Sequence, residues 1–476
     1  MRSKHETDAE NVSNIDYSKF DKINVAVVLT GEEKEIVIEG VKKIDLRIVP
    51  LLCAIYILSL IDRSNIGAAL VNGLRKELKL TTSEEGNATT IFYILYIVFE
   101  GIIPANIILK KVRPHIWFGL IGSLWSISCI GMAFAKNGTT FVIARAFLGA
   151  FEAGFAPGVV GYLNYWYTRS EIGVRTTLFF LAVPVSGVIG GPLSAALAST
   201  NNNNLHALCI TAYFFIIDFP DEATFLTNVQ RNIIVRRLKA EQGIASETKG
   251  SLKELVSIVL DWKVYSFSLI IMGLNNLAII LGVFGAVLIN GMGFSGIKST
   301  YLASIASVGG LFGVILLIFL INKISYWKLI LGYGIVAVSG YSIVVFSKSI
   351  VLRLIFYVIA GFGSVPLLPL TLSWSSANQG GVYKSLIASA IIISFGTVGG
   401  ATVPRLFVAK YAPDYTTGSI VTLAGAGISV VLSVLLGLYF KYENKRRDEN
   451  PVDLSHIPED EQRQLTNSHP NFRFRT

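Results

Sequence analysis

Charged side chains are scarce in this 476-residue chain. They make up 15% of the residues, whereas soluble domains carry about 25%. Hydrophobic residues account for 52%, and the mean hydropathy is +0.57. This balance argues against a water-soluble fold, and the composition predicts an integral membrane protein.

Cysteine is rare, and the usual motifs of enzymes are missing. Cys53, Cys129 and Cys209 fall in apolar runs, where a thiol is most simply a packing residue, so we expect no disulfide framework. The sequence has no Gly-rich phosphate loop ending in Lys-Ser or Lys-Thr and no Cys/His metal spacing, and its five histidines are scattered. We therefore expect that the protein is not an enzyme and that it binds no metal and no cofactor. An ATP-driven pump on this chain alone is also excluded.

Long apolar runs are what the sequence has instead. Twelve of them approach the ~20 residues that an α-helix needs to cross a bilayer. They cover roughly residues 48–70, 88–109, 115–135, 140–162, 176–198, 205–219, 264–289, 299–321, 327–346, 351–372, 385–407 and 419–440. The pattern predicts an all-α integral membrane protein, built as a bundle of twelve helices.

The runs divide into two groups of six, which is the layout of two homologous halves. Lys and Arg are concentrated in the loops after the even-numbered runs, and basic loops stay in the cytoplasm. The formal charge of +9 therefore sets topology and does not predict nucleic-acid binding. We predict a disordered cytoplasmic N-terminal tail (1–43), a first six-helix half (44–219), a central cytoplasmic loop (220–262), a second six-helix half (263–441) and a cytoplasmic C-terminal tail (442–476).

Two local features stand out in this layout. Residues 228–242 in the central loop have helical spacing and a basic face, which predicts an amphipathic helix on the inner membrane surface. The sixth run has only 13 residues before Asp218, about 20 Å of helix against a hydrocarbon core of ~30 Å. We keep this run as a span, abnormally short, because otherwise the second half would invert and expose its basic loops on the outer side.

Ionisable residues occur inside three runs of the first half. Placing such a charge in hydrocarbon costs at least ~2.5–3.5 kcal/mol, so these residues usually face a partner or a wet cavity. The fourth run contains Arg145 and Glu152, which leave the same helix face because seven residues make nearly two turns. The first run contains Asp62 and Arg63, and the second contains Glu100. Each could instead be structural, locking helices together or lying solvated at a helix end.

These residue types are suited to coupling a proton to an organic anion. An acid shielded from water can take up and release a proton near neutral pH, whereas an arginine keeps its charge and its planar fork fits a carboxylate. We interpret Arg63 and Arg145 as anion contacts and Asp62 and Glu152 as proton carriers. The remaining candidates are Tyr96 for substrate contact, Glu100 as a supporting intramembrane charge, and Ser389, Ser394 and Thr397 in the eleventh run as lesser substrate contacts.

The segments that carry these residues resemble a known family. They are LSLIDRSNIGAA in the first run, IVFEGIIPANIILKKVRPHIW across the second run and the loop after it, and RAFLGAFEAGFAPGVVGYLNYWYTRSE in the fourth. With them the chain, from about Lys42 to Glu449, resembles the fungal allantoate permease family, in the anion:cation symporter group of the major facilitator superfamily. The resemblance implies a twelve-helix major facilitator bundle that takes up small organic anions such as allantoate or nicotinate, usually with protons. It also implies anion contact at Arg63 and Arg145 and proton coupling at Asp62 and Glu152.

We therefore expect a plasma-membrane symporter for a small carboxylate, driven by the proton gradient without a cofactor. Its partners would be the organic anion, the proton and the lipid bilayer, with no nucleic acid, and the protein would be a monomer. An internal membrane such as that of the vacuole is the alternative location. The alternative function is a transport-inactive or sensor-like relative, impaired by the shortened sixth span.

Overall fold

The computed structural model describes residues 30–102, 112–197, 219–242, 252–294, 296–379, 382–412, 414–450 and 466–476. These residues form helices joined by turns and short connections, with no strand among them. Residues 1–29 of the predicted N-terminal tail lie outside the described ranges. So do Cys209 and all but the last residue of the predicted sixth run.

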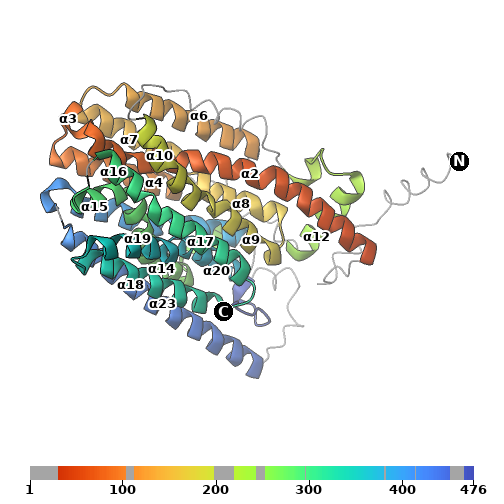
Figure 1. Ribbon diagram of the computed structural model, residues 1–476. Helices are drawn as coiled ribbons and strands as arrows, with labels where there is room; N and C mark the ends of the chain where they lie inside the picture. Colours follow the sequence, from red (N-terminus) through yellow and green to blue (C-terminus); the bar gives the residue numbers. More distant parts are fainter. Residues whose placement is uncertain are drawn as a thin grey trace.

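The long helices run side by side in an elongated bundle (Figure 1). In chain order, the helices before residue 198 are α2 (Gly31–Ala69), α3 (Arg75–Glu77), α4 (Thr82–Ile102), α6 (Pro114–Ala133), α7 (Gly138–Glu152), α8 (Phe155–Trp166), α9 (Arg169–Phe180) and α10 (Ala182–Leu197). Those after it are α12 (Asn228–Gln242), α13 (Leu252–Val259), α14 (Trp262–Val283), α15 (Gly285–Gly291), α16 (Gly296–Ala303), α17 (Ile305–Leu320), α18 (Tyr326–Phe346), α19 (Ile350–Ser364), α20 (Leu367–Ala377), α21 (Val382–Gly396), α22 (Val398–Thr402) and α23 (Thr416–Glu449). Within the described ranges, nine helices or joined helices are long and apolar enough to cross a membrane. The prediction of an all-α membrane bundle is confirmed.

Several predicted spans are broken in the middle. The fourth consists of α7 and α8, which are separated at Ala153 and Gly154, and the tenth consists of α19 and α20, with Pro366 at the start of α20. Proline and glycine permit such breaks because neighbouring helices can satisfy the freed backbone groups. The break after α7 leaves Glu152 as the last residue of that helix.

Helix α2 begins at Gly31, inside the segment predicted to be a disordered tail. Thr30 caps it, and Glu33 completes a reciprocal capping box with Thr30, which satisfies amide groups that would otherwise be free. The first turns then pack against α12, where Glu33 forms an ion pair with Arg236. The predicted helix at 228–242 is confirmed at those same bounds. The disordered interpretation was wrong for residues 31–43 because α12 supplies them with a packing surface.

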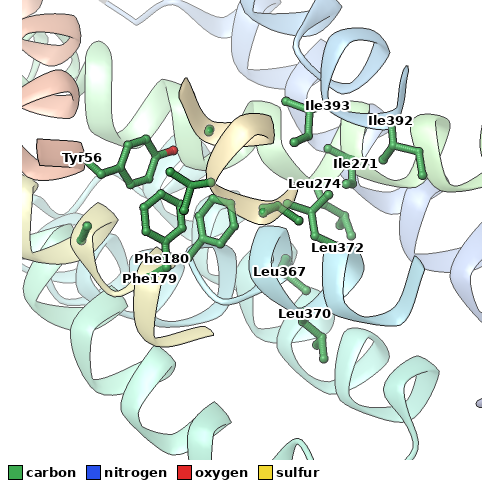
Figure 2. Close-up of a cluster of buried hydrophobic side chains, with 14 of the residues drawn as sticks. Tyr56, Phe179, Phe180, Ile271, Leu274, Leu367, Leu370, Leu372, Ile392 and Ile393 are labelled. Carbon is green, nitrogen blue, oxygen red and sulfur yellow. The ribbon is translucent and has the colours of Figure 1, made fainter. Parts of the chain in front are cut away.

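The helices before residue 198 also contact those after residue 261. α10 packs on α16 and α17, α4 on α21 and α22, α8 on α21 and α9 on α20. Figure 2 shows one apolar cluster at this contact, where Tyr56 of α2 and Phe179 and Phe180 of α9 lie near α14, α20 and α21. The Tyr56 and Phe179 rings are stacked, with their centroids 4.7 Å apart. Apolar surface from both parts of the chain is therefore buried in one core.

The C-terminal segment, residues 466–476, folds back onto the end of the bundle (Figure 1). Trp374 donates its indole N–H to the Arg475 carbonyl at 2.8 Å, and the Asn378 side chain makes hydrogen bonds to both backbone groups of Arg475. Asn444 binds the backbone of Phe474 in the same two-way manner. The segment therefore ties α20 to α23 through its own main chain.

Charged and aromatic side chains complete this docking. Phe474 is buried and stacks on Phe440 with centroids 4.6 Å apart. Lys384 bridges the Asp261 carboxylate and Asn467 of the segment, each at 2.7 Å. Burial raises the pKa of Asp261, but the ammonium groups of Lys384 and Lys263 outweigh this effect and hold it below its usual value. The end of the predicted C-terminal tail is thus a structured part of the fold.

We expect Phe474→Ala to destabilise the protein. It removes a buried ring stacked on Phe440, and truncating a buried Phe costs about 3 kcal/mol or more where the site cannot collapse. The melting temperature of the detergent-solubilised protein should fall by about 1 °C for each kcal/mol lost, because the entropy of unfolding grows with chain length. Arg473→Ala, next door in an exposed ion pair with Asp448, is the control and should shift it by less than a degree or so. Equal melting temperatures for both variants would contradict the docking role of Phe474.

Candidate functional site

A cavity of about 130 Å³ lies at the centre of the bundle, between the two parts of the chain. Its lining comes from α2, α4, α8, α9 and α10 on one side and from α14, α17, α19, α20 and α21 on the other. A small-molecule site is typically a cavity of this kind, apolar with a few polar groups that converge on it. The cavity is therefore the candidate binding site.

The cavity wall is mostly apolar. Arg63 of α2 is the one charged side chain among the described residues that line it. The aromatic side chains of Tyr56, Tyr93, Tyr96 and Phe180 also line the cavity. Polar groups that face the cavity from several helices are Ser64, Ser186, Asn275, Ser307 and Thr397. A ligand in this cavity would meet one fixed positive charge among rings and hydroxyl groups.

Arg63 forms a buried ion pair with Glu152. Its Nη2 lies 2.7 Å from Glu152 Oε1, and the Ser59 hydroxyl donates a hydrogen bond to the same oxygen. The Arg63 side chain is 16% exposed and that of Glu152 is 1% exposed, so the arginine reaches the cavity from in front of the acid. The guanidinium also lies over the ring of Tyr96, 5.0 Å from its centroid. Rings and carboxylate together hold the cation in one position.

Asp62 lies on a different side of α2 from the side that lines the cavity, and Arg145 of α7 contacts α2 there. Asp62 Oδ2 accepts hydrogen bonds from the Trp125 indole at 3.0 Å and from the Cys129 thiol at 3.3 Å. Arg145 Nη1 donates to the Asp62 backbone carbonyl at 3.4 Å. Adjacent residues on a helix point about 100° apart, so when Arg63 faces the cavity Asp62 is turned toward α6. Arg145 is buried and is not part of the described cavity lining.

Arg145 and Glu152 share one face of α7, as their spacing predicts, and both contact α2. The four charges Asp62, Arg63, Arg145 and Glu152 form a cluster in which two positive charges balance two negative ones. A cluster with no formal net charge can be buried, because each ion has an opposite partner nearby. We refer to these four residues as the charge cluster.

Tyr96 and Glu100 come from α4 and lie one turn apart. Tyr96 lines the cavity beneath Arg63, as predicted. Glu100 is 1% exposed, and no donor among the described residues has hydrogen-bond geometry to either carboxyl oxygen. The Ser394 hydroxyl of α21 lies nearby. Glu100 is thus buried at the contact between α4 and α21, separate from the charge cluster.

The lesser candidates of the eleventh run have different positions. Thr397 lines the cavity, whereas Ser389 and Ser394 are buried beside it. Tyr93 and Asn275 were missed as lining residues. Tyr93 shares a helical face with Tyr96 and Glu100, a spacing that would have indicated it. Asn275 has no such signal, since its position depends on how α14 packs against the opposite helices.

The sequence model of the Major Facilitator Superfamily matches residues 52–404. The chain belongs to this superfamily. The cavity between its two parts and the charge cluster beside it therefore lie in a membrane transporter, and the protein is a multi-pass membrane protein. The matched relatives are transporters and not enzymes.

Two relatives that are similar to this chain are named as transporters of organic anions. A putative tartrate transporter of Agrobacterium vitis is 29% identical, with 83% of this chain and 90% of that protein aligned. The high-affinity nicotinic acid transporter of Saccharomyces cerevisiae is 25% identical, over 91% of this chain and 84% of that protein. The chain thus spans most of the length of both transporters.

A solved structure has the same fold. The proton:xylose symporter XylE, bound to a glucose derivative, aligns with a TM-score of 0.61 over 80% of this chain and 94% of that chain. Its sequence is 13% identical, so this likeness concerns the fold alone. It confirms the major facilitator bundle for the described part of the chain.

Proposed function

We propose that this protein is a proton-coupled symporter of a small organic anion and works by alternating access. Within its superfamily, we assign it to the allantoate permease family of the anion:cation symporter group. The observation that carries the proposal is the ion pair between Arg63, which faces the central cavity, and the buried acid Glu152. This pair offers one position for an anion and one for a proton.

The ion pair couples the two ligands because the proton binds Glu152 and the anion binds Arg63. Either ligand alone leaves the other member of the pair without a partner. When Glu152 is ionised, its carboxylate pairs with Nη2 of Arg63, so an incoming anion meets a cation that is already neutralised. When Glu152 is protonated, the fork is free to bind a substrate carboxylate. A buried charge left without its partner costs about 3–5 kcal/mol, so proton or anion alone binds poorly and the two bind well together. Symport follows from that requirement.

The charge cluster also predicts the stoichiometry. Asp62 and Glu152 balance Arg63 and Arg145, so the empty site has no formal net charge. One monoanion together with one proton preserves that balance, whereas a monoanion alone leaves a buried negative charge. We expect one proton to be transported with each monovalent anion.

The cavity lining favours a substrate with one carboxylate and a flat, apolar body. A single arginine can engage one carboxylate, and the aromatic side chains of Tyr93, Tyr96 and Phe180 line the cavity around a flat ligand. A dianion would bring a second charge to a wall with no second cation among the described residues that line it. Of the two relatives, the nicotinic acid transporter is therefore the one named for a substrate that fits this cavity better.

Uptake by whole cells tests the proposal. Cells that express the protein should accumulate a labelled aromatic monocarboxylate such as nicotinate several-fold faster at pH 5 than at pH 7. A protonophore should abolish accumulation, and tartrate should be a poor substrate. A well-expressed protein without pH-dependent uptake of any carboxylate in a panel would overturn the symporter and favour the transport-inactive alternative, which depends on the sixth span outside the described residues.

The remaining assignments follow from the same proposal. The proton gradient is the energy source and no cofactor is needed. We place the protein in the plasma membrane as a monomer. We assign both termini to the cytoplasm because they lie on the same side as the predicted basic loops, and basic loops stay in the cytoplasm. A vacuolar membrane would serve the same chemistry, since it also maintains a proton gradient.

Gly67→Ala should slow transport by preventing a close approach of α2 and α14. A Cβ at Gly67 would overlap the carbonyl oxygen of Val283, which belongs to the other part of the chain. Overpacking of this kind costs about 1–3 kcal/mol in the state where the helices meet. The transport rate should fall roughly 5- to 100-fold, since 1.4 kcal/mol is about tenfold. Gly131→Ala, where a Cβ meets nothing within 4 Å, is the control and should leave the rate unchanged.

A further inference from the structure

Glu100 is a buried acid that the charge cluster does not use. It is 1% exposed, and neither oxygen receives a hydrogen bond from the described residues. Glu152, in contrast, receives two donors, Arg63 and Ser59. The two acids therefore have opposite surroundings, although both lie beside the same cavity.

An ionised carboxylate is unstable where Glu100 lies. A buried carboxylate that forms no ion pair costs several kcal/mol, which one neutral hydroxyl nearby does not offset, and such a group takes up a proton instead. A protonated carboxyl has one O–H donor, and the Ser394 hydroxyl of α21 lies next to it and has no other hydrogen-bond partner among the described residues. Glu100 of α4 and Ser394 of α21 thus come together across the contact between the two parts of the chain.

The charged groups that face Glu100 from the described helices are engaged by other residues and do not form an ion pair with it. Its own helix supplies Tyr96, and α2 supplies Tyr56 and the Arg63 guanidinium, whose charge is already engaged by Glu152. From α7, Arg145 and Glu152 are directed at Asp62 and Arg63.

The remaining neighbours of α4 hold their charges elsewhere. On α21, Lys384 is bound to Asp261 and Asn467. Arg405, in the turn after α22, reaches Thr90 and Asn87 near the other end of α4. Helix α22, residues 398–402, contains no titratable side chain.

We propose that Glu100 is a second proton-binding site, which holds its proton while α4 and α21 are in contact and releases it when they separate. The inference rests on the proposed function, because alternating access is what would separate these helices. Once they part, water replaces Ser394 and solvates the carboxylate, so ionisation is no longer opposed. The proton returns to the same aqueous side when the contact closes again. Glu100 therefore biases the conformational equilibrium by pH without adding to the protons transported per anion.

The sign of the effect follows from linkage. The closed contact binds one proton more than the open one, so acid pH favours closure and rising pH favours opening. For a one-proton difference the equilibrium changes by up to about tenfold per pH unit. At saturating substrate the bound anion keeps Glu152 protonated, so the pH dependence that remains belongs to Glu100.

The test is anion exchange in proteoliposomes, with saturating labelled nicotinate and equal pH on both sides, measured from pH 5 to pH 8. Glu100→Gln keeps the shape and an N–H donor for Ser394 but cannot titrate. We expect it to flatten the pH profile of exchange, while substrate Kd and the proton-to-anion ratio of net uptake stay at wild-type values. Ser394→Ala removes the acceptor and should shift the profile toward lower pH. Ser389→Ala is the control and should leave the profile unchanged, because Ser389 is also buried on α21 and its hydroxyl has no hydrogen-bond partner within the described part of the chain.

Distinct outcomes separate this proposal from the previous one. A wild-type profile in Glu100→Gln or Ser394→Ala, with pH-driven net uptake intact, would overturn the role of Glu100 alone. A lower proton-to-anion ratio in Glu100→Gln would also overturn it, because the proton would then cross the membrane. Loss of proton coupling in the wild-type protein would instead refute the symporter. Ser394→Ala retains the acid, so the proposal stays testable even if Glu100→Gln does not fold.

Discussion

Glu152→Gln should abolish proton-driven accumulation of the anion and leave exchange of bound for free anion largely intact. Glutamine matches the shape of a protonated glutamate, so Arg63 would be free to bind substrate at every pH. The loaded carrier has the same charge as in the wild-type cycle and can change conformation. The empty carrier would contain an unpaired buried cation, which costs about 3–5 kcal/mol. Its return, and with it net uptake, should therefore slow by about 100-fold or more.

Two measurements on the same proteoliposomes check this result. Net uptake driven by an imposed pH gradient should fall to background, while counterflow with substrate on both sides should stay within severalfold of wild type. Glu39→Gln, at an exposed pair with Lys43 on the first turns of α2, is the matched control and should retain both activities. Unchanged accumulation in Glu152→Gln would refute its role as proton carrier.

Arg63→Gln should eliminate transport by removing the charge that faces the cavity. A charge-assisted bidentate contact is among the strongest polar interactions, and no other described lining residue is positively charged. We expect affinity for a monocarboxylate to fall at least about 100-fold, which corresponds to about 2.7 kcal/mol. Arg63→Lys should fall between wild type and Arg63→Gln, because an ammonium keeps the charge but lacks the planar fork.

A double variant distinguishes loss of binding from loss of the fold. Arg63→Gln alone leaves Glu152 without its counter-ion and should lower the thermal stability of the purified protein. Arg63→Gln combined with Glu152→Gln removes both charges and should recover most of that stability, since a neutral pair is often no worse than a buried ion pair. Transport should not recover. Arg473→Gln, in the exposed pair with Asp448, is the control, and recovery of uptake in the double variant would contradict the anion-binding role of Arg63.

Much of the fold could be predicted because a membrane restricts the possible structures. Every backbone polar group in hydrocarbon must be satisfied within its own segment, so an apolar run of spanning length forms a helix. The helix at 228–242 was predictable for a different reason, because its basic residues recur with the period of an α-helix. The start of α2 and the docking of Phe474 were not predictable. Both depend on surfaces supplied by distant segments, α12 in one case and α20 with α23 in the other.

The candidate site was predicted at the level of residue type and helix. Arg145 and Glu152 share a face of α7 at a spacing that requires it, and Tyr96 lines the cavity beneath Arg63. The sequence could not assign partners, because Asp62 and Arg63 are adjacent and either could have faced the cavity. Only the packing of α6 against Asp62 shows which one does, through the Trp125 indole and the Cys129 thiol.

By itself the sequence determined that this chain is a helical membrane protein with opposite charges buried in three helices of its first half. Composition and periodicity suffice for that, because the cost of exposing polar groups to lipid does not depend on tertiary contacts. Only the tertiary structure decided that Arg63 pairs with Glu152, that Asp62 faces away from the cavity, and that Glu100 meets Ser394 and forms no ion pair among the described residues. These outcomes depend on which helix faces which. That arrangement is set by packing across the whole bundle, which no local pattern in the sequence encodes.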